Sequence, residues 1–416
     1  MSMKKPKIRF KGYTEDWEQR KLGDIADVTK LAGFEFTEHV VYSDEGNIIA
    51  LRGLNIKNGQ LILDDVKYID GSNFSKLSRS KLFIDDIMFT YVGTVGEVAI
   101  IKENDRFYLA PNVSRIRVKS DDSPKFISHY MRTDNFKNKV IFPLIATSSQ
   151  PALSMENIRK FTINIPISRE EQDCLAKYFD NLDQLITLHQ RKCNQAKKLK
   201  KYMLQKMFPQ NGEKIPEIRF DGFTDDWEQR KLGEVAASFE YGLNAAAKEY
   251  DDENKYIRIT DIDDNTHEFL TDSLTSPDID LTGADNYKLT EGDILFARTG
   301  ASVGKSYIYR NSDGLVYYAG FLIRARIKEE YDAEFVFQNT LTDRYNKYIA
   351  VTSQRSGQPG VNAQEYAEFE IKVPKKEEQT KIGAYFKQLD HLITLHQRKC
   401  DEMKKIKKFM LQNMFV

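Results

Sequence analysis

The sequence predicts an α+β protein in which a long antiparallel two-helix coiled coil separates two similar mixed α/β domains, related by a pseudo-two-fold internal repeat. Three observations support this prediction. The stretch LITLHQRKC occurs twice, at 185–193 and at 392–400. The stretch IRFKGYTEDWEQRKLG at 8–23 returns as IRFDGFTDDWEQRKLG at 218–233. Around both copies of LITLHQRKC, apolar residues recur at alternating steps of four and three over about five heptads, the pattern of a helix with a coiled-coil seam.

The repeated unit is about half of the 416-residue chain, which is far longer than a solenoid repeat. Between the matched edges the two halves diverge, yet short stretches still correspond. These pairs are 52–56 with 258–262, 86–89 with 293–296, 93–96 with 300–304, 115–117 with 324–326, and 150–151 with 358–359. One fold therefore carries two different surfaces.

Local patterns place the elements within each half. Short apolar runs between glycine-rich turns predict strands at 47–51, 61–69, 87–92 and 98–102, and runs ending in proline predict strands at 161–166 and 369–374. Helical spacing predicts one helix over 124–141 and its counterpart over 334–349. Ser168 and Glu171 form a capping box, and Pro209 ends the first long helix. The predicted boundaries are a first domain 1–168, helix 169–209, linker 210–217, second domain 218–375 and helix 376–416.

The two long helices are predicted to pair with each other. Acidic residues gather at the start of each and lysines toward its end, so an antiparallel pair places opposite charges side by side. About 38 residues at 1.5 Å each give a rod of roughly 57 Å. The predicted seam consists of Leu175, Phe179, Leu182, Ile186, His189 and Cys193 in the first helix, and Ile382, Phe386, Leu389, Ile393, His396 and Cys400 in the second.

Composition excludes several classes of protein. Lys+Arg and Asp+Glu are both 62, so affinity for nucleic acid requires segregated basic surface and not a global excess. No apolar run reaches the roughly 18 residues of a membrane span, and the first ten residues lack the apolar core of a signal peptide. Three cysteines are an odd number, which fits a reducing compartment. We therefore expect a soluble, cytoplasmic protein without a membrane partner.

The repeated edge stretches and the repeated helices resemble those of one protein family. The DWEQRKLG edges, the proline-to-EEQ helix starts and the two LITLHQRK helices closely resemble the specificity subunit of type I restriction-modification enzymes over nearly the whole chain. The resemblance implies two target-recognition domains, each reading one part of a bipartite double-stranded DNA sequence across an unread spacer. It also implies two methyltransferase subunits and restriction (translocase) subunits as partners. Those partners would carry S-adenosylmethionine, ATP and Mg²⁺, and this chain would carry no cofactor.

No pattern predicts catalysis on this chain, and three features that resemble functional sites have another explanation. GASVGKS at 300–306 has one residue too few for a phosphate-binding loop, so we read it as a DNA-facing turn or a tight strand connection. The His-Cys pairs of the two helices lie on the apolar seam, which favours packing over a metal site, and we predict no metal ligand. Trp17 and Trp227 are expected to anchor the junction between domain and helix, the alternative being base stacking.

Base edges are read by Arg, Lys, Asn and Gln, whereas hydroxyls and basic groups hold phosphates. On that chemistry, and on their place in loops that correspond between the halves, we predict DNA contacts from Arg52, Asn55, Thr94, Ser148, Ser149 and Gln150, and from Arg258, Thr260, Arg298, Thr299, Ser302, Lys305, Gln354, Arg355 and Gln358. Two alternatives remain open at this stage: a specificity module for a methyltransferase without a nuclease, and a coiled-coil scaffold that binds proteins.

Overall fold

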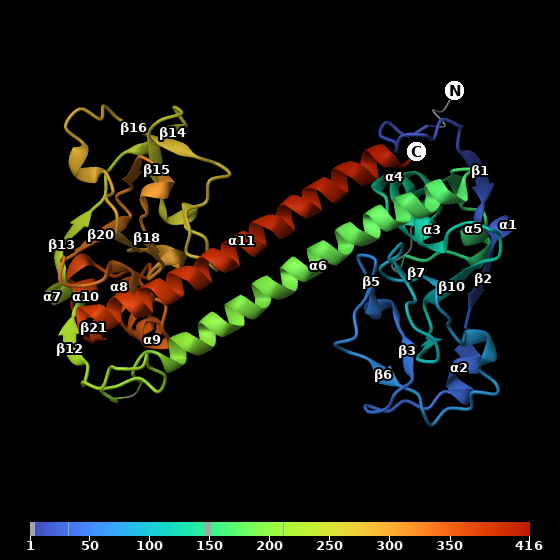
Figure 1. Ribbon diagram of the computed structural model, residues 1–416, viewed down its shortest axis with the longest axis horizontal. Helices are drawn as coiled ribbons and strands as arrows, with labels where there is room; N and C mark the ends of the chain where they lie inside the picture. Colours follow the sequence, from blue (N-terminus) through green and yellow to red (C-terminus); the bar gives the residue numbers. More distant parts are fainter. Residues whose placement is uncertain (1–4, 32, 146–150, 211) are drawn as a thin grey trace. The chain divides into compact units, whose positions relative to one another are not determined.

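The computed structural model describes residues 5–31, 33–145, 151–210 and 212–416. The chain divides into two units (Figure 1). The first comprises residues 1–187 together with 400–416, and the second comprises 188–399. Each unit holds one of the two repeated domains and parts of both long helices, α6 (Arg169–Lys206) and α11 (Lys376–Met414). Among the described residues, no helix is long and apolar enough to cross a bilayer.

The first unit is built on an antiparallel four-stranded sheet in the order β2-β10-β7-β8, beside a smaller sheet β6-β3-β9 in which β3 and β9 are parallel. A two-stranded ribbon pairs β1 with β11, with Glu18 opposite Ile165. The elements are β1 Glu18–Lys21, α1 Leu22–Ile25, β2 Ala26–Lys30, α2 Gly33–His39, β3 Ile49–Leu51, β4 Ile56–Lys57, β5 Gln60–Leu61, β6 Lys67–Tyr68, β7 Ile87–Thr90, β8 Val98–Ile100, β9 Phe107–Leu109, β10 Val113–Val118, α3 Pro124–Met131, α4 Asp134–Phe136, α5 Met155–Arg159 and β11 Thr162–Ile165.

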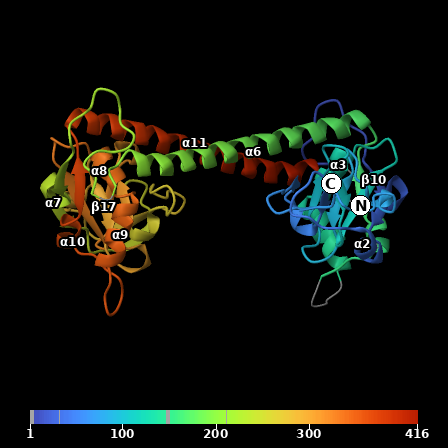
Figure 2. The same ribbon diagram turned by 90° about the horizontal axis from the view of Figure 1, so that it is seen from below.

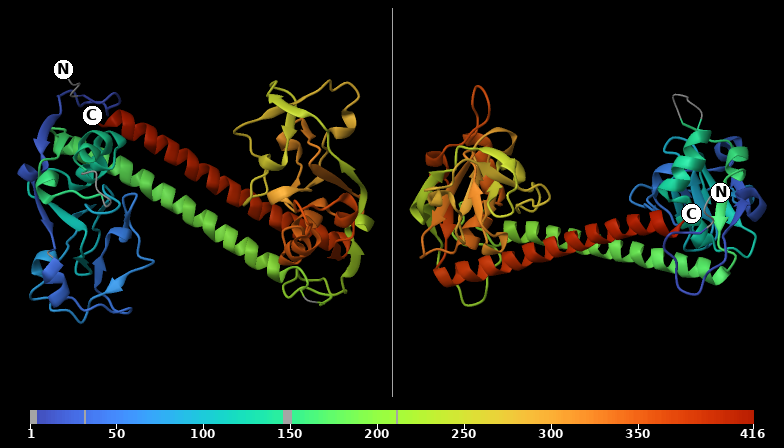
Figure 3. Two further views of the ribbon diagram at one scale, coloured as in Figure 1. Left: turned by 180° about the vertical axis from the view of Figure 1, so that it is seen from behind. Right: turned by 90° about the horizontal axis from the view of Figure 1, so that it is seen from above.

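The second unit repeats this topology in its main sheets. Figure 3 shows the ribbon from two further sides. The four-stranded sheet of the second unit runs β13-β20-β17-β18, a parallel pair joins β15 to β19, and β12 pairs with β21 at the edge. The elements are β12 Glu228–Lys231, α7 Leu232–Val235, β13 Ala236–Tyr241, β14 Ala246–Glu249, β15 Lys255–Ile257, β16 Thr275–Asp278, β17 Ile294–Ala297, β18 Ser306–Ile308, β19 Val316–Tyr318, β20 Leu322–Ile327, α8 Ala333–Asn339, α9 Asp343–Thr352, α10 Ala363–Ala367 and β21 Glu370–Val373. The predicted internal repeat is thus confirmed in strand order.

The single helices predicted over 124–141 and 334–349 are wrong in one respect, because each is broken by a threonine. Thr133 ends α3 by donating to the Tyr130 carbonyl at 2.8 Å, and its hydroxyl accepts from the Phe136 amide to cap α4. Thr342 does the same between α8 and α9, at 2.7 Å to Asn339. A residue that caps a helix and satisfies the last carbonyl of the preceding one favours a sharp break.

The tryptophans anchor each domain to a long helix, as predicted. Trp17 is 1% exposed and packs edge-on against Phe126 of α3 and Phe415, which directly follows α11. Figure 2 shows α3 beside this end of α11 in the first unit. In the second unit Trp227 packs in the same way against Phe335 of α8 and Phe208, which follows α6. Neither indole is available for stacking on a base.

The repeated edge stretches clamp the start of each long helix. Arg9 donates from Nε and Nη2 to the two carboxylate oxygens of Glu171, both at 2.7 Å, and Arg219 forms the same fork with Glu378 at 2.7 and 2.8 Å. Ser168 caps α6 by accepting from the Glu171 amide at 3.3 Å, so one half of the predicted capping box is formed. The carboxylate of Glu171 binds Arg9. Each carboxylate is nearly fully buried, and such bidentate pairs fix geometry firmly.

Within each unit the two long helices run antiparallel. In the first unit Phe179 lies against Phe415 and Asp183 binds Lys407; in the second, His189 lies against His396 and Lys200 binds Asp390. Residue numbers rise along one helix as they fall along the other. All the predicted seam residues are buried, except that Ile186, His189 and His396 are half-buried. Near the helix starts the seam packs on the domain core, as Phe179 and Phe386 do.

Candidate functional site

The residues predicted to contact DNA in the first domain differ in how exposed their side chains are. Arg52 is half-buried and its Nη2 donates to the carboxylate and the carbonyl of Asp65, at 2.8 and 2.9 Å. Asn55 is fully buried: its Oδ1 accepts from the Arg52 amide and its Nδ2 donates to the carbonyls of Ile62 and Asp65. Asn55 therefore holds the loop closed, and its inclusion among the DNA contacts is corrected on that ground. Thr94 is exposed, whereas Ser148, Ser149 and Gln150 lie outside the described residues.

In the second domain, three of the four predicted cations, Arg258, Lys305 and Arg355, are paired with carboxylates of the protein. Arg258 forks onto the Asp261 carboxylate at 2.8 and 2.9 Å, and Asp261 occupies the position that corresponds to Asn55. Lys305 is largely buried and binds the carboxylate of Asp264 at 2.5 Å and the carbonyl of Ile262 at 3.0 Å. Lys305 therefore stabilises the loop that carries Asp264. Arg258 is only partly available to bind an anion, because Asp261 already neutralises its charge.

The glycine-rich turn at 300–306 makes a tight strand connection. Its amides donate within the protein: Gly300 to the Pro359 carbonyl, Val303 to Gly300, Gly304 to Ala297, and Lys305 to Ser302. A phosphate cradle needs such amides to be free. Gly304 has φ +83° and a Cβ there would lie 2.5 Å from Ile349, so glycine is required. The exposed Ala301 and half-buried Ser302 form its outer edge.

The loop 354–360 lies beside this turn. Thr299 bridges Gly360, and Gly300 donates to Pro359. Gln354, Arg355 and Gln358 are exposed, but Arg355 is paired with Glu365 and donates to the Thr352 carbonyl at 2.8 Å. The corresponding contact in the first domain is Gly93 to the Pro151 carbonyl at 3.0 Å. The structure therefore brings Thr299, Ser302 and Gln358 to one surface.

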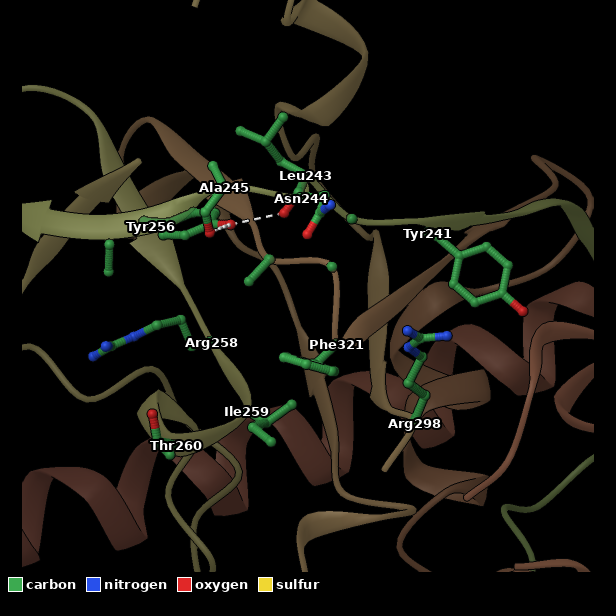
Figure 4. A pocket seen from close by; sticks show the side chains of 14 residues that line it. Tyr241, Leu243, Asn244, Ala245, Tyr256, Arg258, Ile259, Thr260, Arg298 and Phe321 are labelled. Atoms are coloured by element: carbon green, nitrogen blue, oxygen red, sulfur yellow. Dashed lines mark hydrogen bonds between the residues drawn. The ribbon is translucent and has the colours of Figure 1, made fainter. Parts of the chain in front are cut away.

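A cleft of about 640 Å³ opens in the second domain next to these loops (Figure 4). Three predicted contacts line it: Arg258, Thr260 and Arg298. The remaining lining residues are Tyr241, Gly242, Leu243, Asn244, Ala245, Ala247, Tyr256, Ile259, Ala319, Gly320 and Phe321. The Tyr256 hydroxyl donates to the carbonyls of Leu243 and Ala245, at 2.7 and 3.1 Å, and so fixes the rim of the cleft.

Arg298 is one of the side chains that line this cleft. Its guanidinium lies 5.1 Å from the centre of the Tyr241 ring and 5.7 Å from that of Phe321, within the range of a cation–π contact (Figure 4). The two rings are 44% and 56% exposed, so both are accessible from the cleft that they line. Sequence reasoning missed Tyr241 and Phe321, because an aromatic residue at a strand end is normally read as core.

The buried arginines of the sheet have a structural role. Arg324 is fully buried, lies 4.9 Å from the Tyr318 ring centre and pairs with Glu240, and Arg115 pairs with Asp27 at the matching place in the first domain. Burial, with a contribution from the Arg326 charge, lowers the pKa of Arg324 to about 10. The repeated Arg-x-Arg pattern thus serves the fold.

The histidines and cysteines of the seam pack in the helix pair. His189 and His396 meet through their Nδ1 atoms at 3.1 Å, and burial together with the neighbouring His189 and Lys192 lowers the pKa of His396. Cys193 lies 3.7 Å from the Ile393 carbonyl, and Cys400 lies 3.8 Å from that of Ile186. In the described part of the chain, no three His, Cys, Asp or Glu side chains are grouped so that they could hold a metal ion.

Comparison with known proteins agrees with the repeated architecture. The family model "Type I restriction modification DNA specificity domain" matches twice, at residues 14–198 and 224–405. The "Putative type I restriction enzyme MjaX specificity subunit" of Methanocaldococcus jannaschii is 22% identical over 417 residues, covering 95% of this chain and 91% of that protein. The type I restriction enzyme MjaVIII specificity subunit of the same organism is 24% identical over 195 residues, 46% of this chain and 45% of that one.

Among solved structures, the S subunit of the type I restriction-modification system from M. genitalium has the same fold. It superposes with a TM-score of 0.71 at 14% identity and covers 99% of both chains. The two family matches span most of the sequence and coincide with the two structural repeats. This chain therefore belongs to the family of type I restriction-modification DNA specificity subunits.

Proposed function

We propose that each recognition domain of this chain reads one part of a bipartite, asymmetric DNA sequence. The observation that carries the proposal is one strand topology used twice with different side chains at matching loop positions. Asn55 matches Asp261, Glu97 matches Lys305, and Tyr91 matches Arg298. Two different half-sites require the same scaffold with different polar groups, because base edges are distinguished by their pattern of donors and acceptors.

The helix pair acts as the spacer in this proposal. α6 and α11 contain 38 and 39 residues. At 1.5 Å per residue each is roughly 57 Å long, which compares with the ~34 Å between successive major-groove faces of DNA. The unread stretch between the half-sites would then be set by helix length. The ion pairs and packed histidines along the helices support a stiff spacer.

In this proposal, catalysis is carried out by partner subunits. Two methyltransferase subunits would dock on the helix pair and the repeated edges, and restriction subunits would complete the assembly. S-adenosylmethionine, ATP and Mg²⁺ would be bound by those partners, so this chain would act as a non-catalytic subunit in the cytoplasm. The near-identity of the two edge stretches supports two equivalent docking places, since the same surface would be offered twice.

Exchange of one domain tests the proposal. Residues 22–166 are replaced by the equivalent segment of another specificity subunit, the chain is expressed with its methyltransferase partner, and methylated adenines are mapped by sequencing. We expect one half of the methylated sequence to change and the other half to persist. The matched exchange of 232–374 should change the other half only. If either exchange altered both halves, or neither, the modular assignment would be wrong.

Salt dependence separates DNA recognition from a protein scaffold. Phosphate contacts release counterions, so the affinity of the chain with its methyltransferase partner for duplex DNA should fall steeply between about 50 and 200 mM salt. A scaffold that binds only proteins would show no affinity for duplex DNA at either salt concentration.

A further inference from the structure

The two domains place a cation and an aromatic ring at the same position of the sheet, but they exchange the strands that supply them. In the first domain Lys30, at the end of β2, lies 5.6 Å from the Tyr91 ring centre. In the second domain the ring is Tyr241, at the end of β13, and the cation is Arg298, directly after β17.

Strand register shows that the positions are equivalent. Lys30 faces Ser114 on β10, and Tyr241 faces Ile323 on β20; Ser114 and Ile323 in turn face Phe89 and Phe296. The backbone bonds agree. The Tyr91 amide donates to Asn112 and its carbonyl accepts from Leu153, while the Arg298 amide donates to Phe321 and its carbonyl accepts from Val361. Lys30 thus corresponds to Tyr241, and Tyr91 corresponds to Arg298.

Arg298 differs from the other arginines around it. Within residues 218–375, all of which the structure describes, it is the only arginine without a carboxylate within 4.0 Å. Its Nε is buried without a hydrogen-bond partner, and its guanidinium lies between two exposed rings. An unneutralised guanidinium restrained by two neighbouring rings keeps its terminal donors free, so less side-chain entropy is lost when it binds a planar acceptor.

We propose that Arg298 is the specificity-determining residue of the second half-site, reading a guanine through two parallel hydrogen bonds to N7 and O6 in the major groove. This inference rests on the proposed function. Guanine is the base whose major-groove edge presents two adjacent acceptors, and bidentate arginine is its commonest partner. Tyr241 and Phe321 are positioning residues that hold the guanidinium plane. Lys30 is the counterpart in the first domain, where an ammonium supplies a single-point contact to the first half-site.

The test maps adenine methylation for the complete complex carrying wild-type chain, Arg298→Ala or Arg298→Lys. The matched controls are Lys30→Ala and Arg344→Ala, the latter a half-buried arginine of α9 that is paired with Glu370. The wild-type motif should contain a fixed guanine in the half that the exchange of 232–374 changes. Arg298→Ala should relax that one position, reducing the preference for guanine roughly 5- to 150-fold. Arg298→Lys should retain overall affinity and lose most of the preference. Lys30→Ala should affect the other half only, and Arg344→Ala neither.

If Arg298→Ala abolishes methylation, binding of the Arg298→Lys complex to duplexes that carry each of the four bases at that position supplies the same readout. An unchanged guanine preference, or an equal loss of affinity for all four bases, would refute the assignment and leave a phosphate contact or a structural role. A wild-type complex that methylates no two-part sequence would instead overturn the proposed function itself.

Discussion

Replacing Asp183 by asparagine should destabilise the first unit by about 2 kcal/mol. The Asp183 carboxylate lies between Arg132, 2.9 Å away at the end of α3, and Lys407 of α11, so one side chain of α6 joins the domain to both long helices. Burial alone would raise the pKa of Asp183, but the charges of Arg132 and Lys407 outweigh it and the pKa is lowered. The carboxylate is therefore ionised throughout the neutral range.

The magnitude follows from what the substitution leaves behind. Arg132 and Lys407 are each only 12% exposed, and burial already lowers the pKa of Lys407. Removing one partner of a fully buried ion pair costs about 3–5 kcal/mol. Asp183 is 21% exposed, so water compensates part of that loss and about 2 kcal/mol remains. For a unit of this size the melting temperature should fall by roughly 4–8 °C.

The assay uses the two tryptophans as separate reporters, since Trp17 lies in the first unit and Trp227 in the second. In a Trp227→Phe background, urea unfolding is followed by Trp17 fluorescence, and hydrogen exchange compares peptides from α3 and α8. The control is Asp173→Asn, an exposed member of a helix-surface pair with Arg169, for which about 0.5 kcal/mol or less is expected. Equal effects of the two substitutions, or a loss located in α8, would refute the reasoning.

Two further predictions concern the helix pair. Inserting one heptad into both helices, between His189 and Cys193 and between Ile393 and His396, lengthens each by ~10.5 Å; methylation mapping should then report a longer spacer or no activity with unchanged half-sites, and an unchanged motif would contradict the spacer role. Acidification should weaken the contact between His189 and His396, because the pKa of His396 is lowered in the fold while the unfolded chain takes up its proton near pH 6.5. Stability from this contact is thus present above about pH 6.5 and lost below it; melting temperatures at pH 7.5 and 5.5 should differ more for wild type than for the chain with both histidines changed to glutamine.

Much of the architecture was predictable because periodicity and repetition are long-range signals. A heptad pattern that continues over about five heptads is compatible only with a single helix that buries one face. The helices α6 and α11 were therefore predictable from residue spacing alone. The broken helix at Thr133 did not follow, because helical spacing continues through the break and only the local hydrogen bonds to Tyr130 and Phe136 reveal it. Capping threonines and interior threonines are alike in sequence.

The candidate site was predictable only in part. Arg258, Thr260 and Arg298 line one cleft, whereas Asn55 is buried and Lys305 is neutralised by Asp264. Both outcomes depend on how a loop closes. The sequence alone does not distinguish an asparagine or lysine that binds within its own domain from one that faces a ligand. The pairing of Arg298 with Tyr241 required cross-strand register, which no local pattern contains.

The first unit is built from two separate stretches of the chain, which affects the order in which the units can fold during synthesis. Its core includes Met414 and Phe415, and the Ile8 amide donates to the Asn413 carbonyl at 2.9 Å, whereas the second unit is one uninterrupted stretch. A ribosome delivers the chain from its N-terminus, and domains commonly fold in that order. In this protein the second unit can be completed first. The first unit needs residues 400–416, which are synthesised after every segment of the second unit. Until then the side chains that pack on Phe415, among them Trp17 and Phe126, lack that partner and present apolar surface to water.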